Sequence, residues 1–227
     1  MPNWCETNIT ITLVNNSNEA KEQMKLLIEK IESGKEKTEG GGDKFNIIQS
    51  LFPMPDDLNI NSGADTDFGE AIILSTKFDD HTQIDIINNY PWAKDMSRDD
   101  LIIHLVETKM ANLEEGEKAI NNKKVHGCAS WYDWRVKNWG TKWDILISDI
   151  EFNVESVSII GDTAWTPPLA AFTTISEKFN LLHFYISYAE PGCGFQGVAD
   201  IEDGTCDDFS EDYVDDYVDD YDGEDDE

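Results

Sequence analysis

The chain has 227 residues, 40% of them hydrophobic, which is enough for one large domain or for a domain with a sizeable insertion. Its formal net charge is -30, with 17 Lys and Arg against 47 Asp and Glu, and this excess disfavours direct binding of nucleic acid, whose phosphates are held mainly by cations. The apolar runs are shorter than the roughly 18 residues of a membrane-spanning helix, and the N-terminus has no signal-peptide pattern, so we expect a cytoplasmic protein without a membrane partner.

The first part of the chain predicts a strand followed by a helix. Residues 8–14 alternate apolar and polar side chains, the pattern of a half-buried strand. Residues 19–32 carry apolar side chains at the spacing of an amphipathic helix, which begins near Ser17 and ends at Gly34. After it we expect an inserted region of mixed structure at about 59–125, with a strand at 70–78 and a helix that begins at Ser97.

The second part of the chain repeats the alternation of strand and helix. Strands are predicted at 152–160 and 182–190, with a helix at 168–179 between them, and residues 195–202 are compatible with a further strand. The order predicts an α+β fold, a ferredoxin-like split βαβ sandwich with an antiparallel sheet and its helices on one face. We expect residues 1–202 to form this domain and residues 203–227 to form a flexible acidic tail.

Four of the seven tryptophans lie within thirteen residues, 131–143, in the segment from Gly127 to Asp144. On a short helix Trp131 and Trp134 share one face, and the favoured interpretation is that both are buried between the sandwich and the insertion, with Arg135 and Lys137 directed to solvent. The alternative is an aromatic recognition patch, because clustered Trp and Arg are typical of interface hot spots. That patch would consist of Trp131, Trp134, Arg135, Trp139 and Trp143.

Three motifs carry a resemblance to a known family. They are "MPNWCETNITI" at the N-terminus, "PMP" at 53–55 and "WYDWRVKNWGTKWD" at 131–144. Together they resemble an uncharacterised family of phage and plasmid proteins, described by a ferredoxin-like domain in Api-like proteins, over about residues 1–58 and 126–199. The resemblance implies a mobile-element origin, phage above all, and a ferredoxin-like fold. It implies no catalytic residues, since no activity is established for the family.

The titratable residues give little sign of catalysis. His126, Cys128 and Cys193 are a weak signal for a thiolate or metal site, and a small buried cysteine beside a turn is the simpler interpretation. The four cysteines are expected to be free thiols. Phosphate-binding, dinucleotide-binding, zinc-protease and serine-hydrolase motifs are absent from the sequence. We therefore predict a protein that is not an enzyme and that has no cofactor and no catalytic metal.

The C-terminal segment is the most acidic part of the chain. Residues 200–227 contain 16 Asp and Glu and no Lys or Arg, which leaves 31 acidic against 17 basic residues in the first 199, a net charge of -14. Aromatic residues recur there every four positions between acidic pairs. A disordered solubilising tail is one interpretation; the other is a segment that becomes helical on a cationic partner. The predicted partner-binding residues are Phe209, Tyr213, Asp215, Asp216, Tyr217, Asp219, Asp220 and Tyr221.

These observations lead to one functional hypothesis with two alternatives. We expect a non-enzymatic, phage-type acidic protein that binds a basic host protein and inhibits its nucleic-acid-binding surface by nucleic-acid mimicry in the host cytoplasm. One alternative is a phage structural or assembly protein whose tail is only a solubiliser. The other is an unrecognised enzyme that uses the tryptophan segment as a substrate platform.

Overall fold

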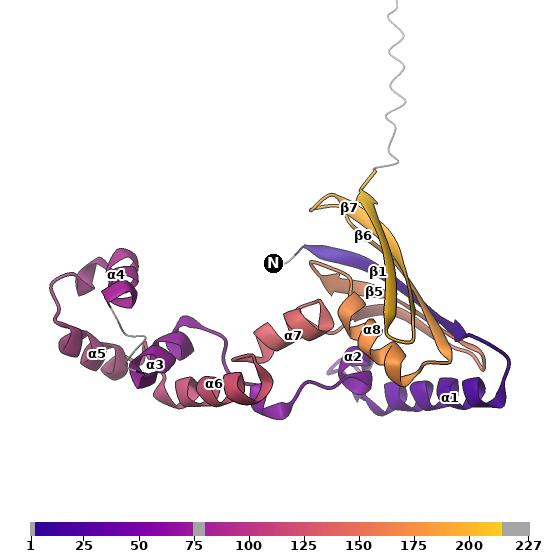
Figure 1. Ribbon diagram of the computed structural model, residues 1–227, viewed down its shortest axis with the longest axis horizontal. Helices are drawn as coiled ribbons and strands as arrows, with labels where there is room; N and C mark the ends of the chain where they lie inside the picture. The colour runs from indigo at the N-terminus through magenta and orange to yellow at the C-terminus, as the bar shows by residue number, and fades with distance from the viewer. Residues whose placement is uncertain (1–2, 75–79, 215–227) are drawn as a thin grey trace, which may run out of the picture. The chain divides into compact units, whose positions relative to one another are not determined.

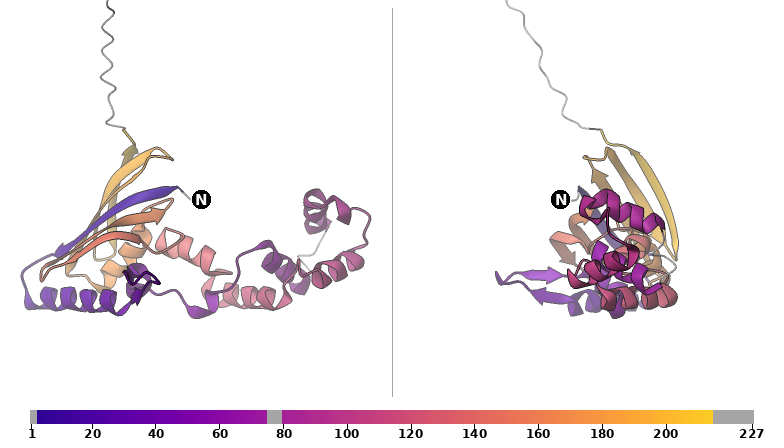
Figure 2. Two further views of the ribbon diagram at one scale, coloured as in Figure 1. Left: turned by 180° about the vertical axis from the view of Figure 1, so that it is seen from behind. Right: turned by 90° about the vertical axis from the view of Figure 1, so that its left-hand side faces the viewer.

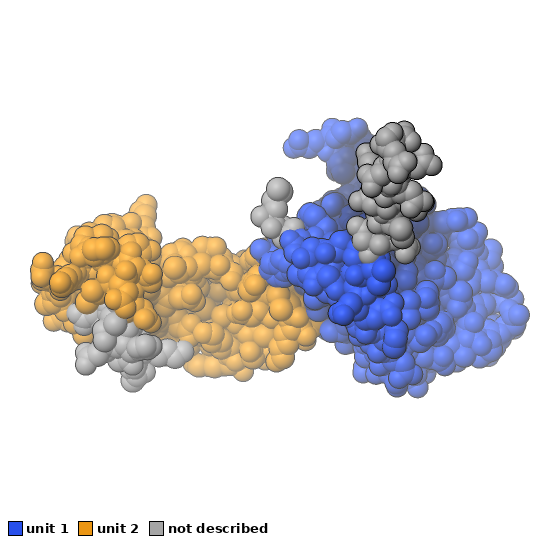
Figure 3. All heavy atoms as spheres, turned by 90° about the horizontal axis from the view of Figure 1, so that it is seen from above, with its two compact units in different colours: residues 1–52, 139–227 blue, residues 53–138 orange. Residues whose placement is uncertain are grey.

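The computed structural model describes residues 3–74 and 80–214, and the chain divides into two compact units (Figure 3). Unit 1 combines residues 1–52 with residues 139–227, and unit 2 is residues 53–138. The second unit is thus longer at both ends than the insertion expected at 59–125.

Unit 1 is built on a six-stranded sheet with strand order β4-β5-β1-β6-β7-β8, in which every neighbouring pair is antiparallel (Figure 1). The order β4-β5-β1-β6, with α1 and α8 as connections, is that of the split βαβ sandwich, so the predicted fold class is confirmed. The strands β7 and β8 extend the sheet beyond β6. The elements are β1 (Trp4–Leu13), α1 (Asn18–Ser33), β4 (Leu146–Phe152), β5 (Ser156–Ala164), α8 (Leu169–Lys178), β6 (Leu182–Glu190), β7 (Phe195–Glu202) and β8 (Thr205–Asp212).

Both helices pack on one face of this sheet, as predicted (Figures 1 and 2). The strand residues that face them are buried in alternation with exposed ones, for example Ile9 and Ile11 on β1 and Phe184 on β6. We call this side the inner face and the opposite side the outer face. The helices contribute a set of side chains with no exposed surface: Met24, Leu27 and Ile31 of α1, and Ala171, Phe172 and Ile175 of α8.

The boundaries of α1 follow from local chemistry. The Ser17 hydroxyl accepts a hydrogen bond from the backbone N–H of Ala20 at 3.1 Å, which satisfies one of the free donors of the first turn. At the other end the Gly34 N–H donates to the Ile31 carbonyl at 3.2 Å. The start and end expected from the sequence are therefore correct.

The strand predicted at 152–160 is wrong in one respect, because this segment contains a turn. Phe152 is the last residue of β4 and Ser156 the first of β5, and the N–H of Asn153 donates to the Ser156 carbonyl at 2.8 Å. Apolar residues alternate on both sides of the turn, at Phe152 and Val154 and again at Val157 and Ile159, with a shift of one position between the two runs. Val154 is 80% exposed. Periodicity alone therefore merged two antiparallel strands into one.

The flexible tail expected from residue 203 onward also needs correction. Residues 203 and 204 form a tight turn, and β8 then pairs with β7 from Thr205 to Asp212. Main-chain hydrogen bonding, which does not depend on apolar side chains, accounts for this strand in so acidic a segment. Residues 215–227 of the expected tail lie outside the described residues.

Smaller elements complete unit 1: β2 (Lys35–Lys37), β3 (Asp43–Phe45) and α2 (Ile47–Leu51). The Asp144 carboxylate accepts hydrogen bonds from the N–H groups of Ile48 and Gln49 at 3.0 and 2.9 Å, so it caps α2. The indole N–H of Trp139, a residue with no exposed surface, donates to the Phe52 carbonyl at 3.1 Å. These contacts attach the end of the tryptophan segment to the core of unit 1.

The described regular elements of unit 2 are all helical, which corrects the mixed structure expected for this region. Residues 70–74 of the strand predicted at 70–78 belong to a helix, and residues 75–78 lie outside the described residues. The helix predicted from Ser97 is confirmed, since its hydroxyl accepts from the Asp100 N–H at 3.2 Å. The elements are η1 (Asp56–Leu58), α3 (Ala64–Leu74), α4 (Asp80–Asn89), η2 (Pro91–Ala93), α5 (Arg98–Glu107), α6 (Leu113–His126) and α7 (Trp131–Trp139), whose last residue belongs to unit 1.

Unit 2 is held together by a close crossing of α3 and α6. A Cβ atom on Gly69 would lie 2.0 Å from the Asn112 carbonyl oxygen, and one on Gly116 would lie 2.4 Å from the Glu70 nitrogen. Only glycine permits this backbone approach. Beside it the buried carboxylate of Glu70 accepts from the Lys123 ammonium at 2.6 Å. A small apolar cluster completes the core: Ala71, Ile86, Ala93, Leu101, Leu105 and Ala111.

Candidate functional site

The outer face of the sheet is the most distinctive surface of unit 1. Both α1 and α8 pack on the inner face, and the side chains of the outer face are mainly exposed or half-buried. Residues paired across neighbouring strands share a face, so the pairings define continuous rows on it. One row, from β8 to β4, is Asp207, Asp200, Tyr185, Thr10, Ser158 and Glu151; the next is Phe209, Val198, Ser187, Asn8, Ile160 and Asp149.

The strands give this face acidic side chains and no Lys or Arg. The six strands contain no Lys or Arg, and their one imidazole, His183, lies 2.9 Å from the Asp200 carboxylate. Two carboxylate pairs stand directly opposite each other on neighbouring strands, Glu6 with Asp162 and Asp200 with Asp207, an arrangement that opposes folding. The acidic residues of the outer face are Glu6, Asp149, Glu151, Asp162, Asp200, Glu202, Asp207 and Glu211.

Large apolar side chains lie among these carboxylates. The exposed fractions are 39% for Trp4, 44% for Ile160, 38% for Tyr185 and 65% for Phe209. Exposed apolar groups within a polar surround are a feature of surfaces that bind other proteins. The outer face thus offers both long-range negative charge and short-range apolar contact.

Three tryptophans from distant segments meet at one end of unit 1. The rings of Trp4 and Trp143 are 5.9 Å apart, and the Lys142 ammonium lies 4.6 Å from the ring centre of Trp143 and 5.4 Å from that of Trp165. The backbone N–H of Trp165 donates to the Asn3 carbonyl at 3.0 Å. Trp165 has a φ of 71°, a conformation that is strained for a bulky residue. The N-terminal motif and the tryptophan segment therefore converge on one aromatic cluster.

Buried hydroxyl groups fix the segments that carry this cluster. The Thr141 hydroxyl donates to the Ala164 carbonyl at 3.0 Å and accepts from the Ala164 N–H at 3.1 Å. The Thr163 hydroxyl donates to the Thr166 carbonyl at 2.8 Å and lies 3.0 Å from the Thr7 hydroxyl. These bonds attach the segment after Trp139 to the end of β5, so the cluster is held on a rigid scaffold.

The buried carboxylate of Glu190 organises the turn after β6. It is 1% exposed, on the inner face, and accepts hydrogen bonds from the N–H groups of Gly192, at 3.1 Å, and Cys193. The hydrogen bond of Glu190 with the Cys193 thiol raises the pKa of that thiol. Burial raises the pKa of the Cys206 thiol and that of Cys5, the latter to about 11. These three thiols lack the lowered pKa of an activated nucleophile.

The weak signal at His126, Cys128 and Cys193 has a structural explanation in part. His126 Nε2 lies 2.8 Å from the Asp57 carboxylate, and this bond holds the pKa of Asp57 below its usual value. Cys128 is a buried residue of unit 2. Among the described residues no group of three or more His, Cys, Asp and Glu side chains is placed to hold a metal ion.

The aromatic patch expected from the sequence is not assembled as predicted. Trp139 is a core residue of unit 1, and Trp143 contacts Trp4 and Lys142. On α7, Trp134 is 7% exposed, in agreement with its predicted burial, whereas Trp131 is only half-buried. Lys137 is exposed as predicted. Arg135 does not point freely to solvent, because its guanidinium lies 5.5 Å from the ring centre of Trp131.

The sequence interpretation missed Trp4 and Trp165 as members of this cluster. Trp4 lies within the N-terminal motif, which was a usable signal. Trp165 stands alone in the sequence, and only the pairing of β1 with β5 brings its segment to Asn3 and Trp4. No local pattern encodes such a contact.

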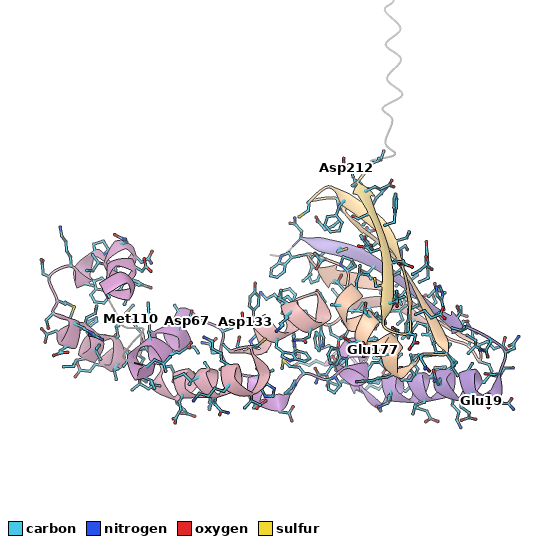
Figure 4. All side chains as sticks on the ribbon, in the orientation of Figure 1. Glu19, Asp67, Met110, Asp133, Glu177 and Asp212 are labelled. Atoms are coloured by element: carbon cyan, nitrogen blue, oxygen red, sulfur yellow. The ribbon has the colours of Figure 1, made fainter. Side chains whose placement is uncertain are left out.

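The predicted partner-binding residues of the C-terminal segment are described only in part. Phe209 lies on the outer face of β8, which ends at Asp212 (Figure 4). The backbone N–H of Tyr213, the next residue, donates to the Gly194 carbonyl at 2.9 Å. Phe209 is a strand residue here, whereas the predicted stripe requires a helix that forms on a cationic partner. The remaining residues lie outside the described part of the chain: Asp215, Asp216, Tyr217, Asp219, Asp220 and Tyr221.

The fold and this surface define an α+β protein with a ferredoxin-like domain and an acidic outer sheet face. Residues 142–227 match the family model of the ferredoxin-like domain in Api92-like protein. The crystal structure of a protein api92 from Yersinia pseudotuberculosis aligns with a TM-score of 0.38 and 14% sequence identity, over 95% of this chain and 99% of that chain. No curated protein matches the chain. Among the described residues no helix is both long and apolar enough to cross a membrane.

Proposed function

We propose that this chain is a non-enzymatic binding protein that uses the outer face of its sheet to bind a basic surface of another protein. The observation that carries the proposal is the composition of the six strands, which contain no Lys or Arg while carboxylates occupy row after row of the outer face. Phosphate groups are repelled by such a surface, whereas Lys- and Arg-rich protein surfaces are attracted to it.

The finer form of the proposal concerns the partner. A protein surface that is basic enough to bind this face is of the kind that binds nucleic acid. The chain would therefore compete with nucleic acid for that surface and inhibit the partner protein. The motifs resemble those of phage and plasmid proteins, which points to a partner in the host cell and to action in the host cytoplasm. Residues 215–227 add nine further carboxylates and extend the attraction to longer range.

The test compares two variants with the same change in charge. The first removes three carboxylates from the outer face with Glu6→Gln, Glu151→Gln and Asp207→Asn. The second neutralises the exposed side of α1 with Glu22→Gln, Glu29→Gln and Glu32→Gln. Proteins captured from a bacterial lysate at low salt and released by duplex DNA are identified, purified and titrated against both variants. We expect the first variant to lose affinity by roughly tenfold or more and the second to lose little.

The result separates three outcomes. Equal loss in both variants would mean that only net charge matters, which contradicts a binding site on the outer face. No loss in either variant, together with loss of binding on deletion of residues 215–227, would assign binding to the C-terminal segment alone. Captured proteins that duplex DNA does not displace would contradict the mimicry, even if the outer face binds them.

A further inference from the structure

The two edges of the sheet differ in whether they can accept another strand. At one edge, β4 changes register against β5 between Ile147 and Asp149. A groove of about 440 Å³ separates β4 from the β2–β3 hairpin, and the ring of Phe45 on that hairpin lies 6.0 Å from that of Phe152. A bulge and a neighbouring hairpin are both devices that block strand addition. The β4 edge is therefore protected.

The β8 edge has neither device. β8 pairs with β7 over eight consecutive residues without a change of register, and no other described strand pairs with it. Such a regular edge presents unpaired main-chain groups along its length and is a template for a further strand. Only the side chains of β8 can therefore limit which strands add to this edge.

The turn before β8 shows which of its main-chain groups face this edge. Asp203 and Gly204 both have positive φ, 45° and 75°, the geometry of a two-residue type I′ hairpin. In such a hairpin the flanking residues, here Glu202 and Thr205, form a hydrogen-bonded pair, and bonded and non-bonded pairs then alternate along the ladder. The bond from the Tyr213 N–H to the Gly194 carbonyl fits this alternation. The N–H groups directed to the free edge are those of Cys206, Asp208, Ser210 and Asp212.

The side chains of β8 decide what can pair there. Asp207 and Glu211 lie on one side of the strand, and Asp208 and Asp212 on the other. A second copy of β8 would place carboxylates against carboxylates on both sides, which is unfavourable. A strand with Lys and Arg would instead form cross-strand ion pairs, with an apolar residue set against Phe209, which is 65% exposed. The charge of the edge therefore excludes self-pairing and selects a cationic strand.

We propose that β8 is the docking site for an extended, Lys- and Arg-rich segment of the partner, which pairs with it as a seventh strand of the sheet. This inference rests on the proposed function, because it assumes a basic protein partner. It adds a mode of binding, strand addition, in which main-chain hydrogen bonds give affinity and alternate side chains give specificity.

The experiment uses a fluorescently labelled nine-residue peptide of alternating Lys and Val as the probe, with the full-length protein at low salt. Two further peptides carry N-methyl groups on main-chain nitrogens. In one peptide the main-chain nitrogen of every Lys is methylated, and in the other that of every Val. All three have the same charge. Because only alternate N–H groups of an added strand face β8, we expect one methylated peptide to lose affinity by about tenfold and the other to bind nearly as well as the parent.

A pair of protein variants tests the same contact from the other side. Ser210→Pro removes an N–H that faces the free edge and leaves the pairing with β7 intact, whereas Ser210→Ala keeps that N–H. We expect weaker peptide binding for the first variant only. If Ser210→Pro fails to fold, amide exchange on the unchanged protein replaces it, and the N–H groups of Cys206, Asp208 and Ser210 should become protected when the peptide binds.

The outcomes distinguish this inference from the proposed function. If both methylated peptides bind like the parent, or the peptide does not bind at all, strand addition is overturned. The affinity of the outer-face variant for the captured proteins then tests the proposed function independently. If one methylated peptide loses affinity but outer-face neutralisation leaves capture of DNA-displaceable proteins intact, the strand-binding edge stands and the proposed use of the outer face fails.

Discussion

The inner and outer faces of the sheet in unit 1 are made by the same strands but meet different requirements. On the inner face Ile9, Phe184 and Ile186 have no exposed surface, and they supply the apolar burial that drives folding. On the outer face Glu6 stands opposite Asp162, an arrangement that opposes folding. The proposed binding function would account for these pairs, because stability alone would favour their replacement.

The sharpest test of this contrast substitutes two consecutive residues of β6. Phe184 is fully buried, with its ring 5.8 Å from that of Phe172, whereas Tyr185 is 38% exposed on the outer face. We expect Phe184→Ala to lower the free energy of unfolding by about 3–5 kcal/mol and Tyr185→Ala to lower it by less than about 1 kcal/mol. Denaturant titration measures both. Similar losses would show that the outer face is also part of the core.

A smaller effect is expected where a glycine makes room on the inner face. A Cβ atom on Gly197 would lie 2.4 Å from the Phe209 carbonyl oxygen on β8 and 2.5 Å from the hydroxyl oxygen of the Tyr188 ring. This hydroxyl donates to the Asp208 carboxylate at 2.6 Å. Gly197→Ala should displace this ring and lower the free energy of unfolding by about 1–3 kcal/mol. The neighbouring change Val198→Ala, on the outer face, should have less effect.

The same variant has a spectroscopic signature. Burial, together with the hydrogen bond to Asp208, raises the pKa of Tyr188 to about 12. Displacement of the ring should lower this pKa, so one tyrosine should ionise at lower pH in an ultraviolet titration of Gly197→Ala than in the unchanged protein. An unchanged titration combined with full stability would show that the backbone adjusts without moving Tyr188.

The sequence was sufficient for much of the fold because the elements around the sheet have clear periods. Residues 8–14 and 182–190 alternate with period two, and residues 19–32 follow a helical period between Ser17 and Gly34. The hairpin at 153–155 was missed because the shift of one position between its two alternating runs was not interpreted as a turn. The strand at 205–212 was missed because its side chains are acidic, although the Asp-Gly turn before it was a readable signal.

The candidate site was less predictable, since it depends on strand pairing. Which face a carboxylate occupies follows from register, and Asp200 and Asp207 become neighbours only when β7 pairs with β8. The grouping of Trp4 with Trp143 likewise depends on the position of β1 between β5 and β6. Composition revealed that the protein is acidic, but not that one face of one sheet carries acidic side chains on five of its six strands without a Lys or Arg among them.

An effect of opposite sign is expected for the outer carboxylates. Asp207→Asn removes one of two like charges that stand directly opposite each other, so it should raise the free energy of unfolding by a few tenths to about 1 kcal/mol at low salt. The gain should shrink as salt screens the repulsion. Glu151→Gln makes the same change in charge opposite Ser158, an uncharged residue, and should have little effect. A loss of stability in Asp207→Asn would instead reveal a structural role for that carboxylate.

The smallest expected effect is local and concerns Glu190, a buried carboxylate of the inner face. Its hydrogen bond raises the pKa of the exposed Cys193 thiol, so this thiol stays protonated to higher pH than an ordinary cysteine and should react slowly with iodoacetamide near pH 8. Glu190→Gln removes the negative charge that opposes the thiolate, which should lower the pKa and shift the pH profile of alkylation to lower pH. Cys5 and Cys128 are buried, and mass spectrometry separates the reaction of Cys193 from that of the half-buried Cys206. Asp200→Asn, on the outer face, should leave the profile unchanged, and a shift in both variants would mean that Cys193 senses the net charge of the sheet rather than its bond to Glu190.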